Sequence, residues 1–219
     1  MTRDPYKIWV SEVILQQTQV AVGMRYYQKF LRRFPTIQQL AAAQESDVLK
    51  VWEGLGYYAR ARNLHKGAQF IRDNFGGKFP SREEELQQIP GIGPYISQAI
   101  LSFAFQKRTI IVDANVKRII ARLLALHLPI GNSNFEMKVE KLSQEILPQK
   151  ESDIFNQALF ELGQTICLPR NPQCPTAPLA GFASHIRRVS RTDCRFDHSS
   201  PQEPYGSTLP GSFGTRENY

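Results

Sequence analysis

A short motif, PGIGP at positions 90–94, constrains the fold of this chain more than any other feature. Proline and glycine end one helix here, which we expect to begin at a capping box formed by Ser81 and Glu84. Pro94 suits the first turn of a second helix that extends to Phe105. The glycine before Pro94 leaves backbone N–H groups free to bind an anion such as phosphate. The same motif also fits an ordinary tight turn between two helices.

Apolar residues recur at helical spacing along most of the chain, and no segment alternates as a strand would. The pattern predicts about ten helices and an all-α fold. The first apolar stretch, residues 8–34, is expected to form two helices broken near Gly23. The other predicted helix starts are a capping box at Thr36 and Gln39, Ser46-Asp47, Tyr57, Val116, a capping box at Ser133 and Glu136, and Ser152-Asp153.

The net charge favours an anionic partner, but only weakly. The 219 residues include 27 Lys and Arg against 20 Asp and Glu, a charge of +7, and a basic balance suits nucleic acid. No apolar run approaches the roughly 18 residues of a membrane span, and the N-terminus is too polar for a signal peptide. Three cysteines are too few for a disulfide framework. We therefore expect a monomeric cytoplasmic protein, associated with the nucleoid if its source is bacterial.

Glu12 is the first candidate catalytic residue. It shares one side of a predicted helix with Ile8, Trp9 and Leu15. Apolar neighbours exclude water from a carboxyl group and raise its pKa, so Glu12 is expected to keep a proton near neutral pH, as a general acid requires. The alternative is a partly exposed helical glutamate whose carboxylate reaches water.

Asp113 is the second candidate. It follows an extended apolar run, residues 109–112, and precedes a predicted helix for which Asp113 or Asn115 would be a suitable N-cap. A helix N-terminus favours the ionised form of a carboxyl group, so Asp113 should be ionised while Glu12 holds its proton. Cleavage of glycosidic bonds uses two carboxyl groups in these two states. A plain helix cap is the alternative, and the sequence does not show that the two groups meet.

A glycine turn followed by two tyrosines opens another predicted helix, whose outer face is basic. The tyrosines could stack on nucleobases, and Arg60, Arg62 and Lys66 could grip phosphates. A solvated cationic face over core tyrosines is the alternative. The glutamine-rich stretch at residues 16–19 could likewise bond to base edges or form a solvated face.

Four stretches together resemble one family, the MutY-type adenine DNA glycosylases of the helix-hairpin-helix superfamily. They are residues 9–20 with SEVILQQTQ, 52–64 with GLGYYARARNL, 89–93 with PGIG, and 112–118 with DANVKR. The hairpin occurs across the superfamily, whereas the first two stretches are more specific, and the resemblance covers residues 4–183. It implies two helical lobes with a DNA-binding cleft between them, a barrel lobe at 4–107 and a second lobe at 108–184. Residues 185–219 match nothing in the family, and their composition predicts a disordered tail.

The resemblance implies excision of adenine mispaired with 8-oxoguanine or guanine in double-stranded DNA, after the adenine flips out of the helix. By motif, Glu12 would protonate adenine N7, and Asp113 would stabilise the oxocarbenium ion or bond to it transiently. Asn115 and Tyr95 would line the same pocket. The residues matched to DNA contacts are Gln16 and Tyr58, which would wedge into the duplex, Gln17, Thr18, Arg60, Arg62, Lys117, and the hairpin residues Pro90, Gly91, Ile92 and Gly93, where a monovalent cation would assist.

Two rival functions remain at this point. Related enzymes of the endonuclease III type carry a lysine just after the hairpin for Schiff-base chemistry, where this chain has Tyr95. Tyr95 therefore favours a monofunctional hydrolase over a glycosylase-lyase. The second rival is a DNA-binding fragment without catalysis. It is expected if truncation at both ends, before residue 4 and at the C-terminal domain that reads 8-oxoguanine, together with loss of the family's iron–sulfur cluster, leaves the second lobe unstable.

The family's iron–sulfur cluster is expected to be absent. A [4Fe–4S] cluster needs four thiolates, which the family spaces as C-x6-C-x2-C-x5-C. Cys167 and Cys174 keep the first spacing, but Ala177 and Ala183 stand at the other two positions and Cys194 is out of register. No histidine is placed to complete a zinc site, so no metal-containing cofactor is expected on the remaining cysteines.

Overall fold

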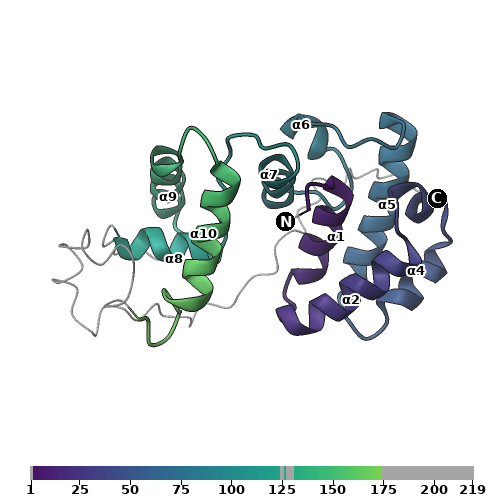
Figure 1. Ribbon diagram of the computed structural model, residues 1–219, viewed down its shortest axis with the longest axis horizontal. Helices are drawn as coiled ribbons and strands as arrows, with labels where there is room; N and C mark the ends of the chain where they lie inside the picture. Colours follow the sequence, from purple (N-terminus) through teal and green to yellow (C-terminus); the bar gives the residue numbers. More distant parts are fainter. Residues whose placement is uncertain (1, 124–125, 127–130, 174–219) are drawn as a thin grey trace, which may run out of the picture.

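The computed structural model describes residues 2–123, 126 and 131–173. Within these residues the chain forms ten α-helices and no strand, which confirms the all-α prediction (Figure 1). None of the described helices is both long and apolar enough to span a membrane. The predicted tail and residues Cys174, Ala177, Ala183 and Cys194 lie outside the described residues. The helices are α1 (Pro5–Leu15), α2 (Val20–Arg33), α3 (Ile37–Ala42), α4 (Glu45–Trp52), α5 (Tyr58–Phe75), α6 (Glu83–Leu86), α7 (Pro94–Phe103), α8 (Ala114–Leu123), α9 (Ser133–Ile146) and α10 (Ser152–Thr165).

The first two helices separate at residues 16–19, so the predicted break near Gly23 is wrong. Gly23 is buried inside α2, where a Cβ would come within 2.7 Å of Leu15 Cδ2. The glycine is therefore a point of close approach between α1 and α2. Gln17 carries the turn instead, with a φ of 55°.

Helix caps confirm one predicted start and correct two others. Thr36 caps α3 by accepting the N–H of Gln39 at 3.3 Å, as predicted. Asn132 caps α9, one residue before the predicted Ser133, because its side chain reaches the free N–H groups of the first turn. Ser81 does not act as a cap, because α6 begins two residues later and has no side-chain cap.

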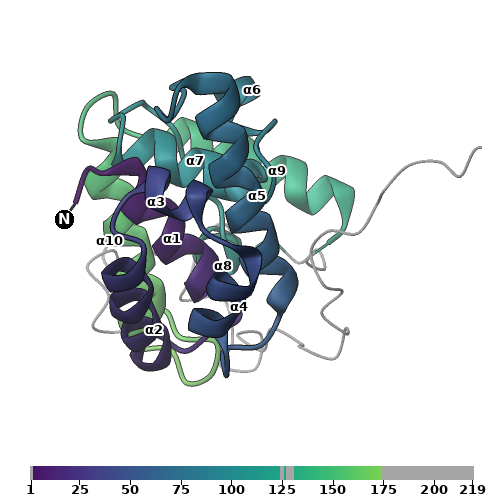
Figure 2. The same cartoon turned by 90° about the vertical axis from the view of Figure 1, so that its right-hand side faces the viewer.

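Among the described residues, the buried apolar side chains form two clusters. The first lies among α1 to α7, and the second lies mainly among α8, α9 and α10. In Figure 1 the helices α8, α9 and α10 stand to the left of α7, and those of the first cluster lie to its right. Helix α1 packs against α2, α5 and α7 (Figure 2). The predicted lobe boundary at residue 107 stays a prediction.

A buried asparagine joins the two clusters. Asn156 of α10 donates hydrogen bonds to Ser102 Oγ of α7 at 2.9 Å and to the Thr109 carbonyl at 2.8 Å. Its side-chain oxygen accepts the Ile111 N–H at 3.1 Å. Because residues 109–111 lead directly to Asp113, these bonds set the position of Asp113 relative to α7.

Candidate active site

Glu12 and Tyr95 meet where α1 packs against α7. The Tyr95 hydroxyl donates a hydrogen bond to the Glu12 carboxyl group. Burial raises the pKa of Glu12, the bond from Tyr95 opposes this shift, and the negative charge of Asp113 adds to it. The net shift is upward, so the site favours the protonated form of Glu12, in the direction that the sequence predicts for a general acid.

Asp113 lies close enough to this pair for its charge to raise the pKa of both Glu12 and Tyr95. One carboxylate oxygen of Asp113 accepts the Val116 N–H at 2.8 Å. The other accepts the side-chain amide of Asn115 at 2.8 Å. Of the two predicted caps, Asp113 is therefore the one that binds the start of α8, and both of its oxygens are held in place.

A buried arginine that sequence reasoning missed lies behind Asp113. Arg118 is 5% exposed, and its guanidinium donates to Asn115 Oδ1 at 2.9 Å. It also donates to the carbonyl oxygens of Gly163 and Cys167, each at 2.8 Å. Three acceptors around one enclosed cation hold α8 against the end of α10 and orient the Asn115 amide toward Asp113.

Gly163 permits the close approach of α10 to this network. A Cβ at position 163 would lie 2.7 Å from Asn115 Cβ, closer than real Cβ contacts occur. The buried side of α10 runs from Ser152 to Gly163 at every third or fourth residue, whereas Phe155 and Leu162 are only partly buried. A glycine within the buried stripe of a helix is the sequence signal that could have indicated this contact.

The predicted hairpin exposes the start of α7. Gly91 has a φ of 84°, and a Cβ there would lie 3.0 Å from Asn63 Cβ of α5. Pro94 is the first residue of α7, as predicted. Within the described part of the chain, the backbone N–H groups of Tyr95 and Ile96 have no protein acceptor. An anion can therefore bind at this helix start.

The predicted base-contacting residues lie on two exposed segments. Gln16 and Gln17 are exposed in the turn after α1, where Thr18 Oγ1 donates to the Gln16 carbonyl at 3.3 Å. Tyr58 begins α5 and is 39% exposed, and its neighbour Tyr57 is 63% exposed. These side chains are accessible, and their contact with DNA stays a prediction.

Three of the predicted cationic contacts, Lys117, Arg62 and Arg60, have partners within the protein. Lys117 Nζ lies 2.6 Å from a Glu136 carboxylate oxygen. Arg62 Nε lies 3.4 Å from a Glu45 carboxylate oxygen, in an exposed pair of the kind that contributes little to stability. Lys117 and Arg62 both stay predicted DNA contacts. Arg60 donates to several backbone carbonyl groups, and its predicted contact with DNA stays a prediction.

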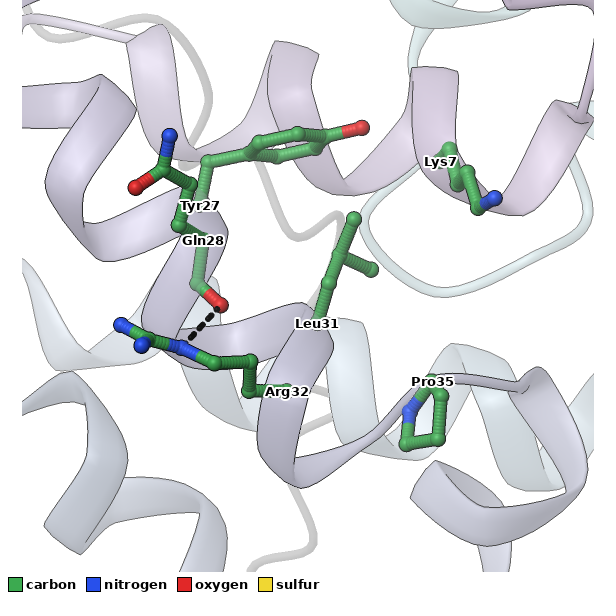
Figure 3. Close-up of a pocket in the computed structure, with 6 residues that line it drawn as sticks. All are labelled: Lys7, Tyr27, Gln28, Leu31, Arg32 and Pro35. Carbon is green, nitrogen blue, oxygen red and sulfur yellow. Dashed lines mark hydrogen bonds between the residues drawn. The ribbon is translucent and has the colours of Figure 1, made fainter.

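A groove of about 460 Å³ lies elsewhere, against α1 and α2. In Figure 3, Leu31 stands between the Tyr27 ring and Pro35, with Lys7 and Arg32 at opposite edges. None of the predicted site residues lines this groove, so it is separate from the candidate active site.

Cys167 is the one predicted remnant of the iron–sulfur site that lies within the described residues. Arg122 donates to its sulfur at 3.3 Å and to the Leu168 carbonyl at 2.7 Å. Two of the four positions that would ligate a cluster are alanines, so the residues present do not fit a four-thiolate site. No group of three potential metal ligands occurs among the described residues. The absence of the cluster stays a prediction, since Cys174 lies outside them.

Residues 10–149 match a family described as "HhH-GPD superfamily base excision DNA repair protein". The chain belongs to this superfamily. The adenine DNA glycosylase of Buchnera aphidicola subsp. Baizongia pistaciae is 42% identical to this HhH-GPD chain over 177 residues, which cover 81% of the chain and 50% of the relative. The adenine DNA glycosylase of Homo sapiens is 39% identical over 192 residues, which cover 87% of the chain and 35% of the relative. The chain therefore spans half or less of the length of these curated relatives.

A solved structure supports the same superfamily fold. The HhH-GPD chain matches a thermostable thymine-DNA glycosylase with a TM-score of 0.74 and 25% identity. The match covers 85% of this chain and 86% of that chain. The predicted helix-hairpin-helix glycosylase fold is thereby confirmed, and the DNA-binding cleft stays a prediction.

Proposed function

We propose that this HhH-GPD protein is a monofunctional adenine DNA glycosylase, acting on adenine mispaired with 8-oxoguanine or guanine. The observation that carries the proposal is that Glu12, Tyr95 and Asp113 meet at one site from distant parts of the chain. Curated relatives named adenine DNA glycosylase support adenine as the excised base.

The reaction uses the two carboxyl groups in different protonation states. Glu12 gives its proton to N7 of a flipped adenine, which makes the base a better leaving group. The bond between C1′ and N9 then breaks, its electron pair stays with the base, and positive charge develops on the sugar. The Asp113 carboxylate stabilises that charge. Water adds to C1′, and the proton it releases returns to the Glu12 carboxylate, which completes the hydrolysis.

The other site residues position these two groups. The Tyr95 hydroxyl orients the Glu12 carboxyl group through its hydrogen bond. The Asn115 amide orients Asp113 and is itself held by Arg118. Small displacements of reacting groups slow a reaction strongly. These contacts therefore support catalysis by positioning, and none of them transfers a proton.

The lack of an amine among Glu12, Tyr95 and Asp113 supports a monofunctional mechanism. A lyase would need an amine to form a Schiff base with the sugar, and Tyr95 offers a hydroxyl at the position where related lyases carry lysine. Lys117 is engaged by Glu136 at 2.6 Å. The product is therefore an abasic site in an unbroken strand, and the proposed reaction needs no cofactor.

The hairpin and the two exposed segments provide the proposed DNA contacts. The free N–H groups of Tyr95 and Ile96 at the start of α7 suit a backbone phosphate, with a monovalent cation at the hairpin. Gln16 and Tyr58 would wedge into the duplex around 8-oxoguanine, and Gln17 would contact the DNA beside them.

Single-turnover cleavage of defined duplexes tests the proposal. The protein is incubated with a duplex that holds adenine opposite 8-oxoguanine, and the products are analysed with and without alkali. A duplex without a lesion and one with thymine glycol are the controls. We expect strand breaks with the first duplex alone, and only after alkali.

Other outcomes of this assay would point to the two rivals. Breaks without alkali would indicate a glycosylase-lyase. Binding without breaks in any duplex would indicate a DNA-binding protein without glycosylase activity.

A further inference from the structure

Arg60 binds the end of helix α1 although it belongs to α5. Its Nη1 donates to the carbonyl oxygens of Val13 at 2.9 Å and Ile14 at 3.2 Å, and also to that of Gln16. These are carbonyl groups of the last turn of α1, which have no partner within the helix and attract a cation. Arg60 therefore caps the C-terminal end of α1, the helix that carries Glu12.

The same guanidinium also binds the segment before α5. Its Nη2 donates to the Gly56 carbonyl at 3.5 Å. The guanidinium carbon lies 5.5 Å from the centre of the Trp52 ring and 5.3 Å from that of Tyr57, within the range of cation–π contacts. The fork of an arginine can serve several acceptors in one plane, whereas a lysine ammonium is a single point.

The two segments joined by Arg60 are those with the proposed base-contacting residues. Residues 16–19 carry Gln16 and Gln17, and residues 54–58 carry Tyr58. Both segments contain a non-glycine residue with positive φ, 55° at Gln17 and 49° at Tyr57. Such conformations cost free energy and persist only when surrounding contacts impose them. Arg60 donates a hydrogen bond to the Gln16 carbonyl in the first segment. In the second segment it donates to the Gly56 carbonyl and stacks on the Tyr57 ring.

We infer that Arg60 is a positioning residue that fastens residues 16–19 to residues 54–58, so that both segments enter the DNA as one rigid unit. The inference rests on the proposed function for the identity of the DNA contacts. In this role Arg60 acts through the two segments that it joins. By holding residues 16–19 and 54–58 together, it keeps the surface around the flipped adenine in a fixed position relative to Glu12, which lies one helical turn before Gln16.

Two variants and one matched control test this role. Arg60→Ala removes all the contacts, and Arg60→Lys keeps the charge without the planar fork. Arg72→Ala is the control, because Arg72 lies on the same helix and also donates to a backbone carbonyl, that of Ala41 at 3.0 Å. Arg72 contacts neither segment, so its loss reports the general cost of removing an arginine from α5.

The first measurement is hydrogen–deuterium exchange of the free protein, at a temperature where all variants are folded. We expect faster exchange in both segments together in Arg60→Ala, and unchanged exchange there in Arg72→Ala. Adding guanidinium at millimolar concentration should slow exchange again in Arg60→Ala, because the ion can fill the vacated site. Unchanged exchange in Arg60→Ala, or a change in one segment alone, would contradict the fastening.

The second measurement is single-turnover excision at saturating protein, together with the ratio of affinities for mispaired and undamaged duplex. We expect Arg60→Ala to lower the rate by about 10- to 100-fold and to reduce the affinity ratio, as small misplacements of a substrate do. The rate and the affinity ratio of Arg60→Lys should lie between those of Arg60→Ala and the wild type.

If Arg60→Ala excised and discriminated as well as Arg72→Ala does, the positioning role would be overturned while the proposed function stood. A wild type that excises no adenine would instead refute the proposed function, and the exchange result would still decide whether Arg60 fastens the two segments.

Discussion

The Tyr95 hydroxyl donates a hydrogen bond to the Glu12 carboxyl group, across the contact between α7 and α1. The bond favours the ionised form of Glu12, whereas burial and the charge of Asp113 favour the protonated form. Burial is the largest of these effects, so the pKa of Glu12 remains raised. The balance among these groups gives predictions for the proposed reaction.

Replacing Tyr95 by phenylalanine should extend activity to higher pH. Glu12 acts as an acid, so excision falls as the pH rises through the pKa of Glu12. Removing the hydroxyl removes the bond that lowers this pKa, and the alkaline limb of the pH–rate profile should therefore move upward. Single-turnover rates across the pH range measure this limb. Tyr27→Phe, on α2, is the matched control, and a limb that stays in place in Tyr95→Phe would show that the bond does not tune Glu12.

Replacing Glu12 by glutamine should abolish excision and leave DNA binding intact. The amide keeps nearly the same shape and can still accept the Tyr95 hydrogen bond, but it has no proton to transfer. General acid catalysis contributes about 10²- to 10⁴-fold, so we expect the single-turnover rate to fall by at least the upper part of that range, to no detectable excision on the timescale of the wild-type reaction. Glu145→Gln, an exposed change on α9, should behave as wild type. Excision by Glu12→Gln at the wild-type rate would show that another group supplies the proton.

The same substitution should make the folded protein more stable at neutral pH. The pKa of Glu12 is raised in the folded state above its ordinary value of 4.5. As the pH rises from that value through the folded-state pKa, the unfolded chain loses this proton first, and the wild type loses stability. Glu12→Gln has no such group, so its advantage in the free energy of unfolding should grow over this window. Urea unfolding of both proteins at several pH values checks the sign, and an advantage that shrinks with rising pH would contradict the raised pKa.

Introducing a side chain at Gly163 should disturb Asp113 from a distance. In Gly163→Ala the new Cβ would meet Asn115 Cβ at 2.7 Å, so Asn115 or α10 must move. Overpacking of this kind costs about 1–3 kcal/mol, and each kcal/mol lowers Tm by about 2–4 °C in a protein of this size. We expect a lower Tm and also slower excision at a temperature where the variant is folded, because Asn115 orients Asp113. Ala158→Ser, on the exposed side of α10, is the control and should change neither the Tm nor the excision rate. An unaltered Tm in Gly163→Ala would show that α10 and Asn115 move apart without loss of stability.

Local features of the structure were predictable from short stretches of sequence. Thr36 caps a helix, Gly76 ends one and Pro94 begins one, because each effect depends on backbone groups within a single turn. Fold class was predictable for a similar reason, since helical periodicity recurs within windows of a few turns. Glu12 was identifiable because its own helical neighbours are apolar.

Relations between distant residues were not predictable in this way. Gly23 reads as a helix break in sequence, yet it is a contact point for Leu15. Arg60 is expected from its sequence position on an exposed basic face, yet it donates hydrogen bonds to the carbonyl groups of another helix. In both cases the deciding atoms belong to a different helix, and periodicity contains no information about which helix that will be.

The candidate active site shows the same division. The sequence alone specified the helices, the hairpin and the chemical types at Glu12, Tyr95 and Asp113. Packing of α7 against α1, and the bonds of Asn156 to the linker, brought these three side chains together. The physical reason is that caps and amphipathic faces arise from interactions within a helix, whereas the distance between two carboxyl groups depends on how whole helices bury their faces against one another.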